Sequence, residues 1–287
     1  MKVYIVGSQG YIGQASAISL KVAGFSVRTV SSNPLIGMSC LDLLHPDKFA
    51  YDEINVEDIV LVMAAVSSPD ICRNQPDFAK AVNVVGTAYF VERCLERGAR
   101  VLFFSSDTVY GPSDDERSES AHCYPSGGYA IMKREVEARF ETHPAFKILR
   151  LSYVFSRVDK FTAYLTTCSR ECRLAEIFHP LFRRPVYLGD LLDLLEIICT
   201  SWDKMSDRII NVCGPELLSR VDMTNLYREV VSPSLHYKVV NPPPDFFVAR
   251  PSVINMSDRN FTRVLDHSPR TIRDAFHAEF DTKEVVL

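Results

Sequence analysis

Short apolar runs rich in valine, isoleucine and phenylalanine alternate with longer segments of helical periodicity in the first half of the chain. Runs that are apolar at every position are typical of strands covered on both faces, and their alternation with helices predicts parallel strands with right-handed crossovers. The expected fold class is therefore α/β, with a doubly wound parallel sheet. The expected strands are 2–6, 25–30, 58–65, 100–106 and 146–152, and the expected helices are 11–23, 75–97, 128–142 and 190–202.

The alternation weakens after Tyr153, where a helical pattern covers 160–178 and strand-like segments are shorter. We expect residues 1–155 to form the main domain, with returns to its sheet near 184–213. Residues 156–287 are expected to form mainly a smaller, interleaved C-terminal lobe that binds substrate.

Composition narrows the class of protein. The 287 residues are 47% apolar, enough for a sizeable core, and the net charge of -4 provides no general attraction for nucleic acid or anionic membranes. The eight cysteines are scattered and no signal-peptide pattern precedes the first strand, so we expect free thiols and a cytoplasmic protein. The most membrane-like segment, 188–200, carries three acidic residues at three-residue spacing, which indicates an amphipathic helix and no membrane span.

A glycine-rich loop joins the first expected strand to the first expected helix in "YIVGSQGYIG". Glycines at such a turn let a pyrophosphate approach the backbone amides at the positive end of the helix. The spacing is GxxGxxG and departs from the general GxGxxG fingerprint, but its place after an N-terminal strand favours a Rossmann-type dinucleotide site. Its expected cofactor-binding residues are Gly7, Gly10, Tyr11, Ile12 and Gly13.

The end of the second strand bears on the choice of cofactor. An Asp or Glu usually stands there to bind the ribose 2′-hydroxyl of NAD, but this chain has the neutral Ser31, Ser32 and Asn33. Arg28 is a nearby cation, although its place inside the strand can equally turn it away from the site. The pattern favours NADP(H) and leaves NAD(H) possible.

Tyr129 and Lys133 stand four residues apart in a helical pattern and therefore share one face. An ammonium beside a phenol is expected to lower the phenol pKa toward working pH, which suits proton exchange with a carbinol or carbonyl. Ser106, at the end of the strand 100–106, could hold the same substrate oxygen.

Three stretches, "AAVSSPDICRNQPDFAKAVNVVGT", "ARVLFFSSDTVYG" and "YAIMKREVE", resemble the extended short-chain dehydrogenase/reductase family. Within it, the similarity is greatest to dTDP-4-dehydrorhamnose reductase and related nucleotide-sugar reductases. The resemblance covers most of the chain and implies that Ser106, Tyr129 and Lys133 are catalytic. It also implies further cofactor-binding residues, namely Asp42, Leu43, Ala64, Ala65, Val66, Asn83 and Tyr153.

The substrate-binding residues implied by this resemblance are Ser67, Asp107, Arg183 and Arg184. Arginine forks match phosphate oxygens, and the second lobe of this family grips the diphosphate of a sugar nucleotide. Solvent exposure or an ion pair with Asp190 is the alternative reading of the two arginines. The acidic run 113–120 is expected to be a solvated loop.

The main hypothesis is an NADPH-dependent reductase of a keto group on a nucleotide-activated sugar of the 4-keto-6-deoxy type. Family dehydratases typically carry Asp then Glu after the catalytic hydroxyl, and Thr108 in the Glu position disfavours elimination. An NAD-dependent nucleotide-sugar 4-epimerase is one alternative. A non-catalytic regulatory subunit, like the beta subunit of methionine adenosyltransferase, is the other, and a homodimer is possible. Cys168, Cys172 and His179 make a poor zinc pattern, so no metal is expected.

Overall fold

A seven-stranded parallel sheet forms the centre of the molecule in a computed structural model that describes residues 1–243, 246–248 and 250–281. The sheet confirms the predicted α/β doubly wound class. The core strands are almost entirely buried, as their uninterrupted apolar sequences predict. In spatial order the strands are β12 (Ile209–Val212), β7 (Phe146–Leu151), β5 (Arg100–Ser106), β4 (Ile59–Val62), β1 (Lys2–Val6), β2 (Ser26–Ser31) and β3 (Ser39–Cys40).

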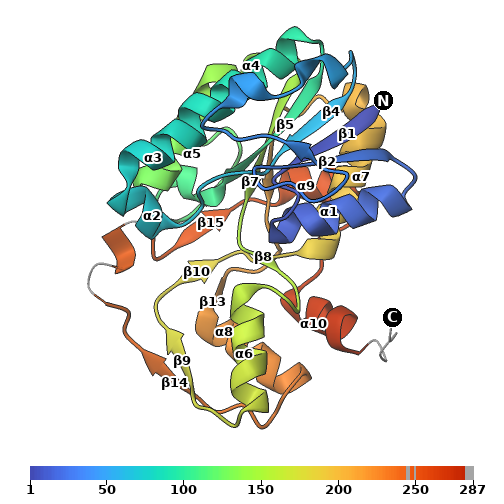
Figure 1. Ribbon diagram of the computed structural model, residues 1–287. Helices are drawn as coiled ribbons and strands as arrows, with labels where there is room; N and C mark the ends of the chain where they lie inside the picture. The colour runs from blue at the N-terminus through green and yellow to red at the C-terminus, as the bar shows by residue number, and fades with distance from the viewer. Residues whose placement is uncertain (244–245, 249, 282–287) are drawn as a thin grey trace.

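Helices cover both faces of this sheet, and Figure 1 shows the two layers. Separate apolar clusters fill the space between the sheet and each layer. One layer consists of α1 (Tyr11–Val22), α7 (Leu188–Ser201) and α9 (Arg259–Leu265). The other contains α4 (Thr87–Glu96) and α5 (Gly128–Phe140), with the 3-10 turns η1 (Pro46–Lys48) and η2 (Tyr51–Glu53) at its edge.

The helix expected over 75–97 is interrupted. Gln75 has an extended φ of -134° between α2 (Pro69–Asn74) and α3 (Pro76–Lys80), because a residue before proline is sterically pushed out of the helical region. A π-helical turn, η3 (Ala81–Gly86), then separates α3 from α4. A π-helical turn changes the direction in which the following side chains point, and this turn lies beside the candidate site.

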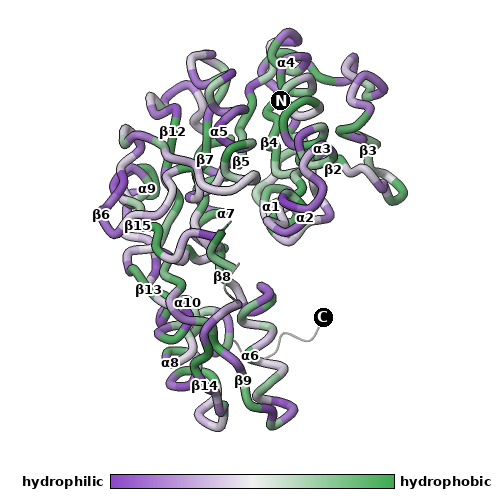
Figure 2. The backbone as a smooth tube through the Cα atoms, turned by 90° about the vertical axis from the view of Figure 1, so that its left-hand side faces the viewer, coloured by the Kyte–Doolittle hydropathy of each residue, from purple (hydrophilic) through white to green (hydrophobic). Residues whose placement is uncertain are grey.

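The C-terminal lobe lies below the main sheet in both Figure 1 and Figure 2. The expectation of a helix over 160–178 is wrong in its second half, since α6 ends at Arg170 and a parallel strand pair follows. A strand forms there because the side chains of Ala175 and Ile177, at alternate positions, point into a buried apolar cluster. The lobe comprises α6 (Lys160–Arg170), β9 (Ala175–Phe178), β14 (Tyr237–Val240), α8 (Arg220–Val230) and α10 (Ile272–Phe280).

Short strand pairs connect the lobe to the sheet. The acidic run is a strand in its first part, contrary to the expected loop: β6 (Ser113–Arg117) pairs with β15 (Ile254–Met256), so tertiary pairing overrides its polar composition. The remaining elements are β8 (Val154–Phe155), β11 (Val186–Tyr187), β10 (Phe182–Arg183), β13 (Leu218–Ser219), and the 3-10 turns η4 (Asp107–Tyr110), η5 (Trp202–Lys204) and η6 (Phe246–Val248).

Candidate active site

The glycine loop between β1 and α1 is shaped by close backbone contacts. Gly7 has φ +90°, and a Cβ there would lie 2.8 Å from the amide nitrogen of Ala64. A Cβ on Gly13 would lie 2.3 Å from the carbonyl oxygen of Gly7, so the start of α1 packs directly on the loop. Gly10 caps α1 without a side-chain bond, and the first turn holds no acidic residue. The first-turn amides therefore suit a pyrophosphate, as the cofactor hypothesis requires.

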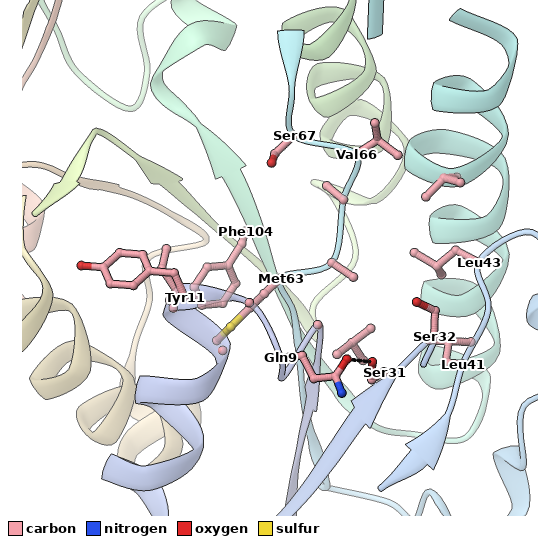
Figure 3. Close-up of a pocket in the computed structure, with 18 of the residues that line it drawn as sticks. Gln9, Tyr11, Ser31, Ser32, Leu41, Leu43, Met63, Val66, Ser67 and Phe104 are labelled. Atoms are coloured by element: carbon pink, nitrogen blue, oxygen red, sulfur yellow. Dashed lines mark hydrogen bonds between the residues drawn. The ribbon is translucent and has the colours of Figure 1, made fainter. Parts of the chain in front are cut away.

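A cleft of about 730 Å³ opens from this loop along the carboxyl ends of the strands. Figure 3 shows its walls, with Tyr11, Met63 and Phe104 on one side and Ser32, Leu41 and Leu43 on the other. The structure brings most of the predicted site residues into these walls: Gly7, Gly10, Tyr11, Ile12, Gly13, Ser31, Ser32, Asp42, Leu43, Ala64, Ala65, Val66, Ser67, Tyr129 and Lys133.

Several wall residues were missed by sequence reasoning, among them Gln9, Leu41, Met63, Phe78, Val82 and Phe104. Gln9 could have been found from its place inside the glycine loop. Its side chain accepts a hydrogen bond of 2.7 Å from the Ser31 hydroxyl and donates one of 2.9 Å to the Asn33 carbonyl. Gln9 thus ties the loop to the end of β2, as the dashed line in Figure 3 marks.

Two predicted cofactor residues near β2 lie outside the cleft wall. Arg28 is exposed on the strand, so the alternative in which it faces away holds and it supplies no charge to the cleft. Asn33 contributes only its backbone, which accepts from Gln9 and donates to Ser31. Lys133 is the cationic side chain among the residues that line the cleft.

Asn83 and Tyr153 also lie behind the wall. The Asn83 amide accepts from the N–H of Val66 at 2.7 Å and donates to its carbonyl at 3.0 Å, so it holds the segment after β4 in place. These two bonds satisfy the backbone N–H and the carbonyl of Val66, which lies after the end of β4 and has no strand partner. The Tyr153 hydroxyl donates to Asp159, the N-cap of α6.

Tyr129 and Lys133 meet in the cleft wall on adjacent turns of α5. The Lys133 Nζ lies 5.8 Å from the Tyr129 ring centroid and donates a 2.7 Å hydrogen bond to the Phe104 carbonyl. Burial lowers the pKa of Lys133 to about 8, with Glu137 opposing the shift. Burial, followed by the charge of Asp107, raises the pKa of Tyr129. The expected lowering of the phenol pKa is therefore wrong for this structure, because desolvation dominates and the charge of Asp107 adds to it.

The Ser106 hydroxyl lies at the junction of β5 and η4, one residue beyond the cleft wall. It accepts from the amide and the hydroxyl of Thr108, at 3.2 and 3.0 Å, and donates to Asp107 at 3.0 Å. It therefore caps η4 with all of its hydrogen-bonding capacity in use. Ser105, beside it, lines the cleft with a buried hydroxyl that has no hydrogen-bond partner among the described residues. A polar ligand group would satisfy it.

Asp107 connects this junction to the C-terminal lobe. Its buried carboxylate forms an ion pair with Arg183 of β10, whose Nε lies 3.2 Å away. Burial raises the pKa of Asp107 while Arg183 opposes the rise. The Arg183 guanidinium also donates to the carbonyls of Phe182 and Pro251.

Arg184 has a different role from the one expected. Its guanidinium donates to three backbone carbonyls, those of Gly214, Pro215 and Met256, and pairs with Glu116 and Asp258. These acceptors occupy the whole fork, so Arg184 serves to tie β6, β15 and the segment after β12 together. Its alternative partner Asp190 instead binds Arg270.

Neither a metal cluster nor a membrane-spanning helix occurs in the described ranges. No group of three or more His, Cys, Asp or Glu side chains is positioned to hold an ion there. Cys168 is buried in the lobe, whereas Cys172 lies beyond the end of α6 with φ +51°, so the two thiols do not share a helix face. No described helix has the length and apolar character needed to cross a bilayer.

Comparison with known proteins identifies the family. The model of the NAD dependent epimerase/dehydratase family matches residues 3–176, more than half of the chain. The chain belongs to this family. The expectation of an NAD(P)-dependent oxidoreductase of the extended short-chain dehydrogenase/reductase type is thereby confirmed at the level of family.

Individual relatives are distant. The beta subunit of methionine adenosyltransferase 2 from Xenopus tropicalis is 24% identical over 67% of this chain and 60% of its own length. The dTDP-4-dehydrorhamnose reductase of Mycolicibacterium smegmatis is 24% identical over 80% of this chain and 69% of its own. The matches thus span about two thirds of these relatives. The solved structure of MoeE5 in complex with UDP-glucose and NAD has a TM-score of 0.80 at 20% identity, covers 98% of both chains, and shares the fold.

Proposed function

We propose that the protein is an NADPH-dependent reductase acting on a keto group of a nucleotide-activated sugar of the 4-keto-6-deoxy type. The observation that carries the proposal is the meeting of Tyr129 and Lys133 in the wall of the cleft that begins at the glycine loop. The similarity to a dTDP-4-dehydrorhamnose reductase supports the substrate class.

Each of these residues has a separate role in the proposed reduction. When bound, NADPH supplies the hydride. Tyr129 donates its proton to the carbonyl oxygen, and its raised pKa keeps that proton in place at neutral pH. The Lys133 ammonium stabilises the phenolate that results and binds the cofactor ribose. Ser106 steadies the substrate oxygen, for which one of its bonds to Thr108 opens.

The preference for NADPH rests on the end of β2. Ser31 and Ser32 line the cleft there and are neutral, so no carboxylate at this strand end repels a 2′-phosphate. Because Arg28 faces away, we expect the preference over NADH to be modest.

The test is an assay of the purified protein with NADPH and dTDP-4-keto-6-deoxyglucose, together with UDP- and GDP-linked analogues. We expect stoichiometric oxidation of NADPH with reduction of the sugar. Tyr129→Phe should abolish turnover while NADPH binding, followed by nicotinamide fluorescence, is retained. Good NADPH binding with no turnover of any ketosugar would count against the proposal.

A 4-epimerase is a second candidate, favoured by the fold shared with MoeE5, which was solved with UDP-glucose and NAD. It would retain NAD through purification and interconvert sugar epimers without net consumption of NADPH. Release and identification of the copurified nucleotide distinguishes it from the reductase.

A regulatory subunit is a third candidate, favoured by the similarity to the beta subunit of methionine adenosyltransferase 2. The Ser106 hydroxyl, fully engaged as a structural cap, is compatible with it. A regulator would tolerate loss of the Tyr129 hydroxyl, so unchanged behaviour of Tyr129→Phe in every assay would favour this candidate.

A further inference from the structure

The last two residues of β5 are both serines, and their side chains leave the sheet on opposite faces. Residues paired directly across two strands share a face, and successive residues alternate. Ser105 is paired with Arg150 of β7, whose guanidinium reaches Glu137 of α5. Ser106 is paired with Leu151, which packs on the cluster beneath α1 and α7. Ser105 therefore points to the α5 face of the sheet and Ser106 to the α1 face.

Lys133 extends from α5 over the same face of β5 as Ser105. Its Nζ lies 4.5 Å from the ring centroid of Phe103, which precedes Ser105 by two residues and shares its face. The Nζ also donates, at 2.7 Å, to the carbonyl of Phe104, which is joined to Ser105 by a peptide bond. The side chain of Phe104 points the other way, toward Tyr11 and Met63 (Figure 3). The ammonium thus lies beside the start of Ser105.

The ammonium and the Ser105 hydroxyl both have hydrogen-bonding capacity to spare. A lysine ammonium has three N–H donors, and the bond to Phe104 is the hydrogen bond that Nζ forms in the described part of the chain. The Ser105 side chain is 3% exposed, and its oxygen has no partner among the same residues. A buried hydroxyl without a partner is costly. Ser106 is already engaged with Asp107 and Thr108, so it has no such capacity.

Three titratable side chains face Lys133 from α5 and α2. Glu137 is one turn further along α5 and already forms an ion pair with Arg150. Cys72 of α2 donates its thiol hydrogen to a backbone carbonyl. Tyr129 presents its ring, with the centroid 5.8 Å from Nζ. Glu137 and Cys72 act on the charge of Lys133 through space, and none of the three forms a hydrogen bond with Nζ in the described structure.

We propose that Ser105 is a positioning residue for Lys133, because its hydroxyl accepts a second N–H of the ammonium and holds the charge beside Tyr129. The two serines then have separate tasks: Ser105 fixes the lysine, and Ser106 steadies the substrate oxygen. The inference rests on the proposed function for the role of Lys133 in turnover, whereas the contact itself can be tested without turnover. An acceptor favours the charged lysine, so loss of the hydroxyl should lower the pKa of Lys133.

An NMR titration of the Lys133 Cε resonance tests the contact, and loss of the resonance in Lys133→Arg assigns it. We expect Ser105→Ala to lower the titration midpoint by about one pH unit relative to the wild type. This is the tenfold change expected for loss of a hydrogen bond to a charged group. Ser257→Ala is the matched control, because the Ser257 hydroxyl is also buried without a described partner but does not line the cleft. It should leave the midpoint unchanged.

The pair Ser105→Thr and Ser105→Val separates the hydroxyl from packing and replaces the alanine variant if that variant does not fold. The two side chains have nearly the same shape and differ in the hydroxyl. We expect the threonine variant to titrate like the wild type and the valine variant to show the lowered midpoint. An unchanged midpoint without the hydroxyl, equal midpoints in the threonine and valine variants, or an equal shift in Ser257→Ala overturns the inference.

Kinetics separates failure of this inference from failure of the proposed function. The alkaline limb of kcat/KM should move to lower pH in Ser105→Ala, whereas Ser106→Ala should lower kcat without moving this limb. If the wild type reduces ketosugars and the Lys133 titration does not depend on Ser105, the inference fails and the function stands. If the titration depends on the Ser105 hydroxyl but no ketosugar is turned over, the inference stands and the reductase fails.

Discussion

At the scale of single residues, burial controls the chemistry of the cleft. Tyr129 and Lys133 have opposite charges in their ionised forms, and desolvation penalises both. The phenol therefore keeps its proton and the lysine loses its own at a lower pH than usual. This combination suits a proton donor for reduction better than a base for oxidation.

The pKa of Lys133 leads to a pH prediction. The side chain is charged below about pH 8 and neutral above it. Because the positive charge stabilises the phenolate left when Tyr129 gives up its proton, we expect kcat/KM for reduction to fall as the pH rises through about 8. A Lys133→Met variant, which cannot titrate there, should show low activity without this step. A wild-type profile that is flat from about pH 6 to 10 would contradict the assignment.

Ser106 allows a second prediction at this scale. Ser106→Ala removes the cap of η4 and the hydroxyl that steadies the substrate oxygen, so we expect kcat to fall by about 10- to 100-fold with NADPH affinity nearly unchanged. Ser106→Thr keeps the hydroxyl and should retain most activity. If the alanine and threonine variants lose activity equally, the hydroxyl is not the important group and steric fit is.

At the scale of elements, the π-helical turn η3 brings α4 and the β3–η1 segment into close contact. A Cβ on Gly86 would lie 1.7 Å from the carbonyl oxygen of Leu43, a cleft residue. In the same turn, Asn83 holds the backbone of Val66. One irregular turn thus positions two sides of the cofactor cleft.

Gly86→Ala should separate this turn from Leu43. Since the clash is with backbone, which cannot rotate away, we expect a loss of about 1–3 kcal/mol or more in the free energy of unfolding, and weaker NADPH binding. Urea denaturation and nicotinamide fluorescence measure the two effects. Gly128→Ala is the control for stability, because a Cβ there meets its nearest atom at an ordinary 3.5 Å. Equal stability of both variants would show that the close approach is not required.

At the scale of the whole molecule, a buried polar network anchors the catalytic helix to the far edge of the sheet. Arg150 of β7 donates to both Glu137 oxygens of α5, at 3.1 and 2.8 Å, and to the Tyr110 hydroxyl. Tyr110 in turn donates to Asn211 of β12. The network joins α5, β7, η4 and β12, so the position of Tyr129 depends on residues from distant parts of the chain.

Breaking this network should be costly. Glu137→Gln leaves Arg150 as a buried cation without a charged partner, for which we expect a loss of about 3–5 kcal/mol in the free energy of unfolding. The double replacement Glu137→Leu with Arg150→Met should lose less than the sum of the single changes, because no unpaired charge remains. The surface pair Arg139–Glu92, whose side chains are 52% and 48% exposed, is the control and should contribute about 0–1 kcal/mol. Additive losses in chemical denaturation would contradict the coupling.

The amino-acid sequence was enough to predict the parallel sheet, the glycine loop and the Tyr129–Lys133 pair. Apolar periodicity, turn glycines and helical spacing are local properties, and local sequence carries them. Only the folded structure reveals the orientation of Arg28, the structural role of Arg184 and the strand in the acidic run. The direction of the pKa shift of Tyr129 is also opposite to the expected one. These properties depend on burial and on contacts between residues far apart in the chain. The spacing of residues in the sequence gives no information about burial or about such contacts.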